Sequence, residues 1–202
     1  MRVKILLSFL MSVLSLSLFA QDNELFYSRG VQRSDQGDYK GAIKELDESI
    51  RLNPKKADAY FLRGKCKYEQ EDFNGALEDF NLAINYQYIS HEVFYLRANL
   101  KYDQKDFKGA ASDYSKAIEQ DGSDPAAYYN RGLAKFNFKD WKGAIADFTE
   151  AVNKNPENAD YFFNRGTARL KIGDKKGACE DFTKAGELGD EEAKEYVISN
   201  CF

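Results

Sequence analysis

Residues 125–158 read PAAYYNRGLAKFNFKDWKGAIADFTEAVNKNPEN, and the pattern in this stretch organises most of the chain. Its eighth residue belongs to a series of small residues spaced 34 apart, namely Gly30, Gly64, Ala98, Gly132 and Gly166. A Gly-Ala pair recurs with the same period, beginning at residues 41, 75, 109, 143 and 177. Five units of this length fill residues 23–192 without insertion. The sequence therefore predicts an array of five repeats, numbered here 1 to 5 from the N-terminus.

The residue pattern within each repeat predicts a pair of helices. In the second half, apolar residues such as Ala144, Phe148 and Ala151 lie at i, i+4 and i+7, which places them on one face of a helix. The first half carries two aromatic residues at positions four and five, and the small residue at position eight lets the two helices approach closely. An aspartate between the halves is a good N-cap for the second helix. These N-cap residues are Asp38, Asp72, Asp106, Asp140 and Asp174. Pro54 and Pro156 are expected to stop the second helix of repeats 1 and 4.

The recurring positions resemble the tetratricopeptide repeat (TPR) family, with an aromatic at four, glycine at eight, alanine at twenty, an aromatic at twenty-four and alanine at twenty-seven. Repeat 1 departs from this pattern at Leu46 and Ser49, and Ala98 replaces glycine in repeat 3. The resemblance implies an all-α fold, a right-handed superhelical solenoid of five TPR helix-turn-helix repeats followed by a C-terminal capping helix. The expected boundaries are 23–56, 57–90, 91–124, 125–158 and 159–192 for the repeats and 193–202 for the capping helix.

Charged residues recur in phase with the repeat. Position seven, usually leucine in the family, is arginine in every repeat: Arg29, Arg63, Arg97, Arg131 and Arg165. Position twenty-three is acidic in every repeat: Glu45, Asp79, Asp113, Asp147 and Asp181. In this family the first helices line a groove, and position seven is expected to face away from it. Position twenty-three lies beside the apolar stripe of the second helix, formed by positions twenty, twenty-four and twenty-seven, so the two should meet between the helices. We interpret the two series as structural ion pairs rather than as a binding site.

The resemblance also implies a binding groove lined by the first helices, at positions two, five, nine, twelve and thirteen. The candidate protein-binding residues at these positions are Tyr27, Phe61, Tyr68, Tyr95, Asn99, Tyr102, Tyr129, Phe136 and Phe163. Aromatic side chains offer a large contact area and suit an extended or helical peptide. Acids at positions two and thirteen of repeats 1 to 3 predict that one end is acidic and the other nearly neutral. The alternative is that the residue at position five packs mainly against the neighbouring repeat.

The first twenty residues differ from the rest. Arg2 and Lys4 form a cationic start, an apolar and serine-containing run follows, and Ala20 ends it. This layout predicts a secretory signal peptide over residues 1–20, cleaved before Gln21, and export to the periplasm, the cell envelope or the medium. The alternative is an uncleaved anchor, but a membrane span needs about 20 apolar residues and this run is shorter. No integral membrane span is expected after cleavage.

Several kinds of chemistry find no support in the sequence. Removal of the first twenty residues leaves 27 basic and 33 acidic residues, a net charge of −6, which disfavours nucleic-acid binding. His91 is the only histidine and has no cysteine at ligand spacing, so no metal is expected. The glycines fall at repeat positions rather than in a phosphate-binding loop, and no cofactor is predicted. No residue is marked as a catalytic acid or base, so we do not expect an enzyme.

The functional prediction is a non-catalytic protein–protein interaction scaffold or adaptor of the cell envelope, which binds a peptide or protein segment in an aromatic, partly acidic groove. One alternative is a glycan-binding module, since aromatic rings also stack on sugar faces. Another is an assembly chaperone of the envelope, which would release its partner rather than retain it.

The three cysteines have different expected roles. Cys66 replaces a usual alanine and is predicted to be a small buried core residue. Asp190 can cap a last helix that covers the apolar end of the array, as repeat arrays require. Cys201 could then reach Cys179 and form a disulfide in an oxidising compartment, although spacing alone leaves three free thiols as the alternative.

Overall fold

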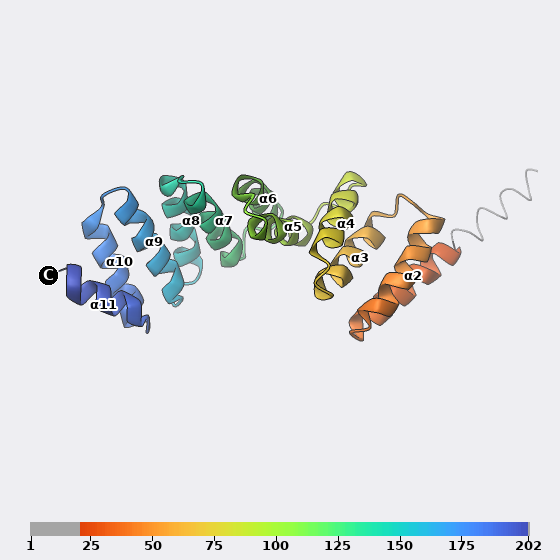
Figure 1. The fold of residues 1–202 in the computed structure, drawn as a ribbon, viewed down its shortest axis with the longest axis horizontal. Helices are drawn as coiled ribbons and strands as arrows, with labels where there is room; N and C mark the ends of the chain where they lie inside the picture. Colours follow the sequence, from red (N-terminus) through yellow and green to blue (C-terminus); the bar gives the residue numbers. More distant parts are fainter. Residues whose placement is uncertain (1–20, 202) are drawn as a thin grey trace, which may run out of the picture. The chain divides into compact units, whose positions relative to one another are not determined.

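The computed structural model describes residues 21–201, so the predicted signal peptide over residues 1–20 lies outside the described residues. The chain divides into two compact units, an N-terminal unit up to Ile89 and a C-terminal unit from Ser90. Throughout the described part of the chain the regular structure is helical, in agreement with the predicted all-α class (Figure 1).

The N-terminal unit contains repeats 1 and 2. A helix that runs to residue 35 is followed by α2 (Tyr39–Leu52), α3 (Ala57–Glu69) and α4 (Phe73–Asn85). Helix α3 packs against both α2 and α4. The core of the N-terminal unit includes Ala42, Leu46 and Ala59, and Cys66 lies with them at 1% exposure. The prediction that Cys66 is a small core residue is therefore confirmed.

The C-terminal unit contains repeats 3 to 5 and a final helix. Its helices are α5 (His91–Asp103), α6 (Phe107–Gln120), α7 (Pro125–Asn137), α8 (Trp141–Lys154), α9 (Ala159–Lys171), α10 (Lys175–Glu187) and α11 (Glu191–Asn200). From α5 to α11 each helix packs against the next, so pairs stack on pairs (Figure 1). Buried alanines line the contacts, and Tyr114, Phe148 and Phe182 fill the space between the helices.

Local capping explains where the helices begin. Helix α8 begins at Trp141, directly after Asp140. Asp140 Oδ1 accepts a hydrogen bond from the backbone N–H of Gly143 at 3.0 Å. The equivalent aspartates before α2, α4, α6 and α10 do the same, so the predicted N-caps are confirmed. Helix α11 begins at Glu191, and Asp190 is its N-cap, as expected, because its Oδ1 accepts from the Ala193 N–H.

The small residue at position eight permits the close approach of the paired helices. A Cβ added to Gly64 would lie 2.7 Å from Phe80 Cε1, and one added to Gly132 would lie 2.7 Å from Phe148 Cε1. Both phenylalanines have 0% exposure. Because a real Cβ contact is never this short, the aromatic at position twenty-four fills the volume that glycine leaves. The sequence interpretation of this position is confirmed.

Candidate functional site

The predicted groove residues of the C-terminal unit come from its first helices, α5, α7 and α9. Tyr95, Asn99 and Tyr102 lie on α5, and Tyr129 and Phe136 lie on α7. Phe163 occupies the same position on α9 that Tyr129 occupies on α7. All six side chains are partly exposed, neither buried in the core nor fully in solvent. The stacked helix pairs therefore leave a row of half-buried polar and aromatic groups.

Each ring at position five has a face against the core. Tyr95 meets Tyr114 edge-on with ring centroids 5.7 Å apart, and Phe163 meets Phe182 edge-on at 5.5 Å. Tyr129 lies 4.8 Å from the Tyr161 ring. Burial, followed by the charge of Asp160, raises the pKa of Tyr129 to about 12. The Tyr95 and Phe163 contacts lie within one repeat and the Tyr129 contact reaches the next repeat, so packing within and between repeats accounts for part of each ring.

Tyrosine hydroxyls join neighbouring first helices through asparagine amides. Asn130 Nδ2 on α7 donates to Tyr95 Oη at 2.8 Å. Asn164 Nδ2 on α9 donates to Tyr129 Oη at 3.0 Å in the same way. The sequence interpretation missed both asparagines. The available signal was an asparagine directly after the aromatic pair, which occurs in repeats 4 and 5 and is leucine in repeats 2 and 3.

A second tyrosine–asparagine contact lies seven residues, about two turns, further along the same helices. Asn137 Nδ2 on α7 donates to Tyr102 Oη at 3.0 Å. Asn99 is also engaged, since its Oδ1 accepts from Tyr114 Oη at 2.6 Å. Hydrogen bonds thus fix the orientation of the polar groups on this face before any ligand arrives.

The predicted groove residues of the N-terminal unit are less uniform. Phe61 is 6% exposed and stacks on Tyr88 with ring centroids 4.4 Å apart, so it offers little surface to a ligand. Its assignment to the groove is therefore corrected to a packing residue, because the segment after α4 folds back over its ring. Tyr27 and Tyr68 are partly exposed, and Lys56 Nζ lies 4.4 Å from the Tyr27 ring centroid.

The arginine and aspartate series converge between the helices of repeats 2 to 5. Arg63 Nε and Nη2 donate to the two carboxylate oxygens of Asp79 at 2.9 and 2.6 Å. Burial acts to lower the pKa of Arg63, but the hydrogen bonds and charge of Asp79 outweigh it and raise that pKa above its ordinary value. The same two-point contact joins the pairs Arg97–Asp113, Arg131–Asp147 and Arg165–Asp181.

A second cation, at position eleven, completes each of these clusters and was not predicted. Lys67 Nζ lies 2.8 Å from Asp79 Oδ2. Lys101, Lys135 and Arg169 make the equivalent contacts at 2.7, 2.8 and 2.9 Å. The four aspartates are no more than 3% exposed, so each buried carboxylate is held by two cations. The two cations lie at i and i+4 on one helix face, and this spacing is the signal that the sequence contained.

Repeat 1 differs from this scheme. Glu45 lies 3.4 Å from Arg33 Nε, at position eleven, whereas Arg29 lies over the Phe26 ring with its Cζ 5.8 Å from the centroid. The expected contact of Arg29 with Glu45 is therefore wrong. Glutamate is one methylene longer than aspartate, and here its carboxylate meets the cation one turn further along the first helix.

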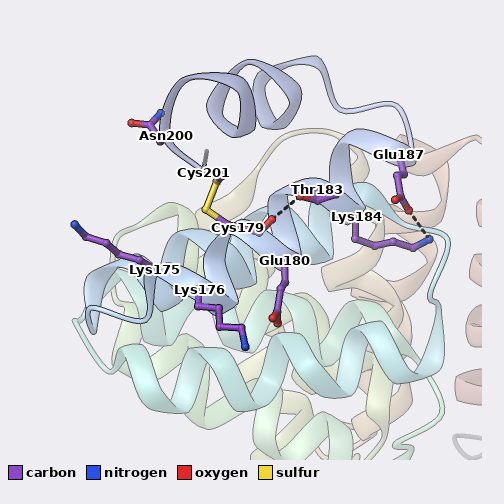
Figure 2. A pocket seen from close by; sticks show the side chains of 9 residues that line it. All are labelled: Lys175, Lys176, Cys179, Glu180, Thr183, Lys184, Glu187, Asn200 and Cys201. Atoms are coloured by element: carbon purple, nitrogen blue, oxygen red, sulfur yellow. Dashed lines mark hydrogen bonds and ion pairs between the residues drawn. A yellow bond between two sulfur atoms is a disulfide. The ribbon is translucent and has the colours of Figure 1, made fainter.

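The two C-terminal cysteines are joined in the structure. Cys179 on α10 and Cys201 after α11 form a disulfide with their Cα atoms 5.8 Å apart (Figure 2). The free cysteine among the described residues is Cys66. The bridge lies beside a surface cavity of about 730 Å³.

Within residues 21–201, no group of three histidine, cysteine, aspartate or glutamate side chains is arranged to hold a metal ion. His91 Nδ1 lies 3.1 Å from the Ala117 carbonyl oxygen, between the paired helices α5 and α6. None of the helices in the described part combines the length and the apolar character needed to cross a membrane.

Comparisons with known proteins agree with this architecture. A TPR repeat model matches residues 33–70 and 98–137, and a tetratricopeptide repeat model matches residues 135–192. No curated protein sequence matches the chain.

Several solved structures are similar in fold. YrrB, described as a TPR protein with an unusual peptide-binding site, aligns with a TM-score of 0.80 at 20% identity, over 86% of this chain and 90% of its own. A MamA protein aligns with a TM-score of 0.76 at 20% identity, over 87% and 96%. MamA from Desulfovibrio magneticus RS-1 aligns with a TM-score of 0.72 at 22% identity, over 83% and 94%. At these identities the likeness concerns the fold alone.

Proposed function

This chain belongs to the tetratricopeptide repeat family, and we propose that it is a non-catalytic scaffold or adaptor that binds a peptide or protein segment. The fold is that of protein-interaction scaffolds, and the similar YrrB is described as peptide-binding. The proposed contact surface is the face formed by the first helices α5, α7 and α9 of the C-terminal unit.

The observation that carries this proposal is the row of oriented side chains on that face. Tyr102 and Phe136 are partly exposed, so their rings can give contact area to a partner. The Tyr102 and Tyr129 hydroxyls accept from asparagines, and a phenol that accepts through oxygen keeps its own O–H as a donor. Because the asparagines fix these groups in advance, a bound peptide would lose less conformational freedom.

A capture experiment tests the proposal. The purified chain, immobilised in folded form, is incubated with cell-envelope extract beside a Tyr102→Ala, Phe136→Ala variant whose circular dichroism matches that of the native chain. We expect the native chain to retain a protein that the variant loses. These two residues are preferred to Phe61, whose truncation would disturb the core.

A matched control removes exposed apolar surface elsewhere in the same unit. Ile172 is 42% exposed and lies directly after α9, and Ile172→Ala should retain the partner. Equal loss in the control and the groove variant would indicate nonspecific capture and contradict the proposal. If no protein is retained but an envelope glycan binds, as measured by calorimetry, the glycan-binding alternative would replace it.

A difference in kinetics separates the adaptor from the assembly chaperone. An adaptor should hold its partner through extended washing, whereas a chaperone should release it when the partner's own binding site is supplied. The half-life of the captured complex, measured by surface plasmon resonance with and without that competitor, distinguishes the two.

We also propose that the chain is exported. The cationic, apolar and small-residue layout of residues 1–20 supports a cleaved signal peptide, and a disulfide between Cys179 and Cys201 suits an oxidising compartment. The intact mass of the protein recovered from the envelope should match a chain that begins at Gln21. A full-length mass would contradict cleavage.

A further inference from the structure

The last helix, α11, is attached to the repeats by a small apolar contact. Ala193 is its one buried residue in the described structure. The Tyr196 ring packs on Phe182 with centroids 4.5 Å apart, and Val197 is partly buried against the same cluster. Beneath them lie the apolar residues of α10 that would otherwise face solvent. Helix α11 therefore acts as a cover over the end of repeat 5.

The disulfide supplies a second attachment, at the opposite end of this helix. Asp190 caps the start of α11 near the end of α10, while Cys201, directly after α11, is bonded to Cys179 near the start of α10. The helix has ten residues. Isolated helices shorter than about 12–15 residues are marginal in water, so α11 depends on these two attachments for its order.

The bridge is accessible from solvent. Cys179 and Cys201 are both partly exposed and line the surface cavity of about 730 Å³, together with Lys175, Lys176 and Thr183 (Figure 2). A cavity of this size admits an attacking thiol. Lys175 and Lys176 stand in the first turn of α10, one turn before Cys179, and Glu180 and Glu187 line the same cavity.

Cys66 has the opposite environment. It is 1% exposed, its Sγ lies 3.5 Å from Ser34 Oγ, and burial raises the pKa of its thiol. A buried thiol with a raised pKa is a poor nucleophile and is shielded from reagents. Thiol chemistry in the described part of the chain is therefore confined to the C-terminal pair.

We propose that the Cys179–Cys201 bridge is a thiol–disulfide exchange site that latches α11 over the end of repeat 5. The reductant is a dithiol, either a small molecule or a thioredoxin-type protein. One of its thiolates attacks a sulfur of the bridge and expels the other cysteine as a thiolate, which takes up a proton. The second thiol of the reductant then attacks the mixed disulfide and releases the remaining cysteine.

The balance of this exchange is two electrons. The bridge gains two electrons and two protons and becomes two thiols, while the dithiol becomes a disulfide. After reduction α11 is held by its contacts through Ala193, Tyr196 and Val197 alone. Its loss of order would expose Phe182 and the apolar surface around it, without unfolding repeats 3 to 5.

Reduction of the folded chain tests the latch. The native protein is treated with dithiothreitol without denaturant, alkylated and digested, and a parallel sample is followed by hydrogen exchange with mass spectrometry. We expect alkylation at Cys179 and Cys201 but not at Cys66. Amide exchange over residues 191–200 should accelerate by about a hundredfold, with exchange in α5 to α9 unchanged.

Two variants provide controls. Cys179→Ser with Cys201→Ser should show the fast exchange of α11 without any reductant, whereas Cys66→Ala should respond to dithiothreitol as the native chain does. A bridge that resists dithiothreitol until urea unfolds the repeats would overturn the exchange site. A reduced chain whose α11 amides stay protected would overturn the latch.

Discussion

Repeats 1 and 4 have the same length and the same pair of helices but different interiors. In repeat 4, Arg131 and Lys135 converge on the buried carboxylate of Asp147, and the Phe148 ring fills the space beside Gly132. These groups give the pair a buried ionic cluster next to an aromatic core.

Repeat 1 uses smaller and more neutral groups. Leu46 takes the place of the aromatic ring, and Glu45 contacts Arg33 from a less buried position. Asn23 is 3% exposed and donates to the backbone oxygen of Ser49 at 2.6 Å and to its Oγ at 3.0 Å. The comparison teaches that the helix pair does not require the ionic cluster. The cluster instead makes repeats 2 to 5 sensitive to the loss of a single partner.

The largest expected effect comes from unbalancing the cluster of repeat 4. Replacing Asp147 with alanine leaves Arg131 and Lys135 beside the core without their anion, which should cost about 3–5 kcal/mol. Replacing Glu45 with alanine should cost less than about 1 kcal/mol, because the Arg33 side chain is 46% exposed and the pair is screened by water. Urea unfolding followed by circular dichroism measures both.

A double variant provides the control for this prediction. Arg131→Leu combined with Asp147→Leu removes both main charges and should recover most of the stability lost in Asp147→Ala. If the double variant is as unstable as the single one, volume rather than charge determines the loss. Our interpretation of the cluster would then be wrong.

The next effect concerns the close approach of the helices. Gly132→Ala places a methyl group against the buried Phe148 ring and should cost about 1–3 kcal/mol. Gly30→Ala meets Leu46 Cγ at 2.8 Å, and because a leucine side chain is smaller than a phenyl ring and not rigidly planar, we expect a smaller loss. Thermal unfolding of the two variants measures which one loses more stability. A greater loss for Gly30→Ala would contradict this prediction.

Substitutions at the turn between the paired helices should have a smaller effect on stability, with opposite signs in repeats 4 and 1. Lys139 in repeat 4 has φ of 69°, and Gly37 at the same position of repeat 1 has φ of 76°. Left-handed backbone strains residues that carry a Cβ, so Lys139→Gly should stabilise by roughly 1 kcal/mol and Gly37→Ala should destabilise by a similar amount. Melting temperatures that shift in the same direction for both variants would refute this account.

An effect of similar size, seen only at alkaline pH, is expected at position five. Burial first, and then the charge of Asp160, raises the pKa of Tyr129 to about 12, above its ordinary value near 10. The stability that the neutral phenol contributes is fully present below pH 10 and is lost as the pH rises toward 12. Tyr129→Phe should therefore lose about 1 kcal/mol less stability than the native chain between pH 9 and 11.5.

Tyr27 is the matched position in repeat 1. Burial, followed by the charge of Asp58, also raises the pKa of Tyr27. Tyr27→Phe should change the alkaline response in the same direction but less than Tyr129→Phe does. Unfolding curves collected at both pH values measure the difference, and an unchanged response in the Tyr129 variant would argue against the assignment.

The repeat period alone determined the number of helix pairs, their N-caps and the meeting of position seven with position twenty-three in repeats 2 to 5. These features depend on contacts within one pair, where a fixed spacing of 16 residues brings Arg131 and Asp147 together wherever the pair occurs. Repeat 1 is the exception, because Glu45 contacts Arg33 rather than Arg29. Glutamate is longer than the aspartate of the other repeats, and the spacing of the sequence does not show the effect of that length.

Only the tertiary structure decided which aromatic residues remain available to a partner. Phe61 and Tyr95 occupy the same position of their repeats, yet Phe61 lies buried beneath Tyr88 and Tyr95 stays partly exposed with its hydroxyl held by Asn130. The reach of Cys201 to Cys179 depended equally on how α11 settles on α10. The burial of an aromatic ring and the distance between two cysteines depend on how one helix pair packs on the next. A periodic sequence specifies the contacts within each pair more directly than it specifies which residues cover that pair.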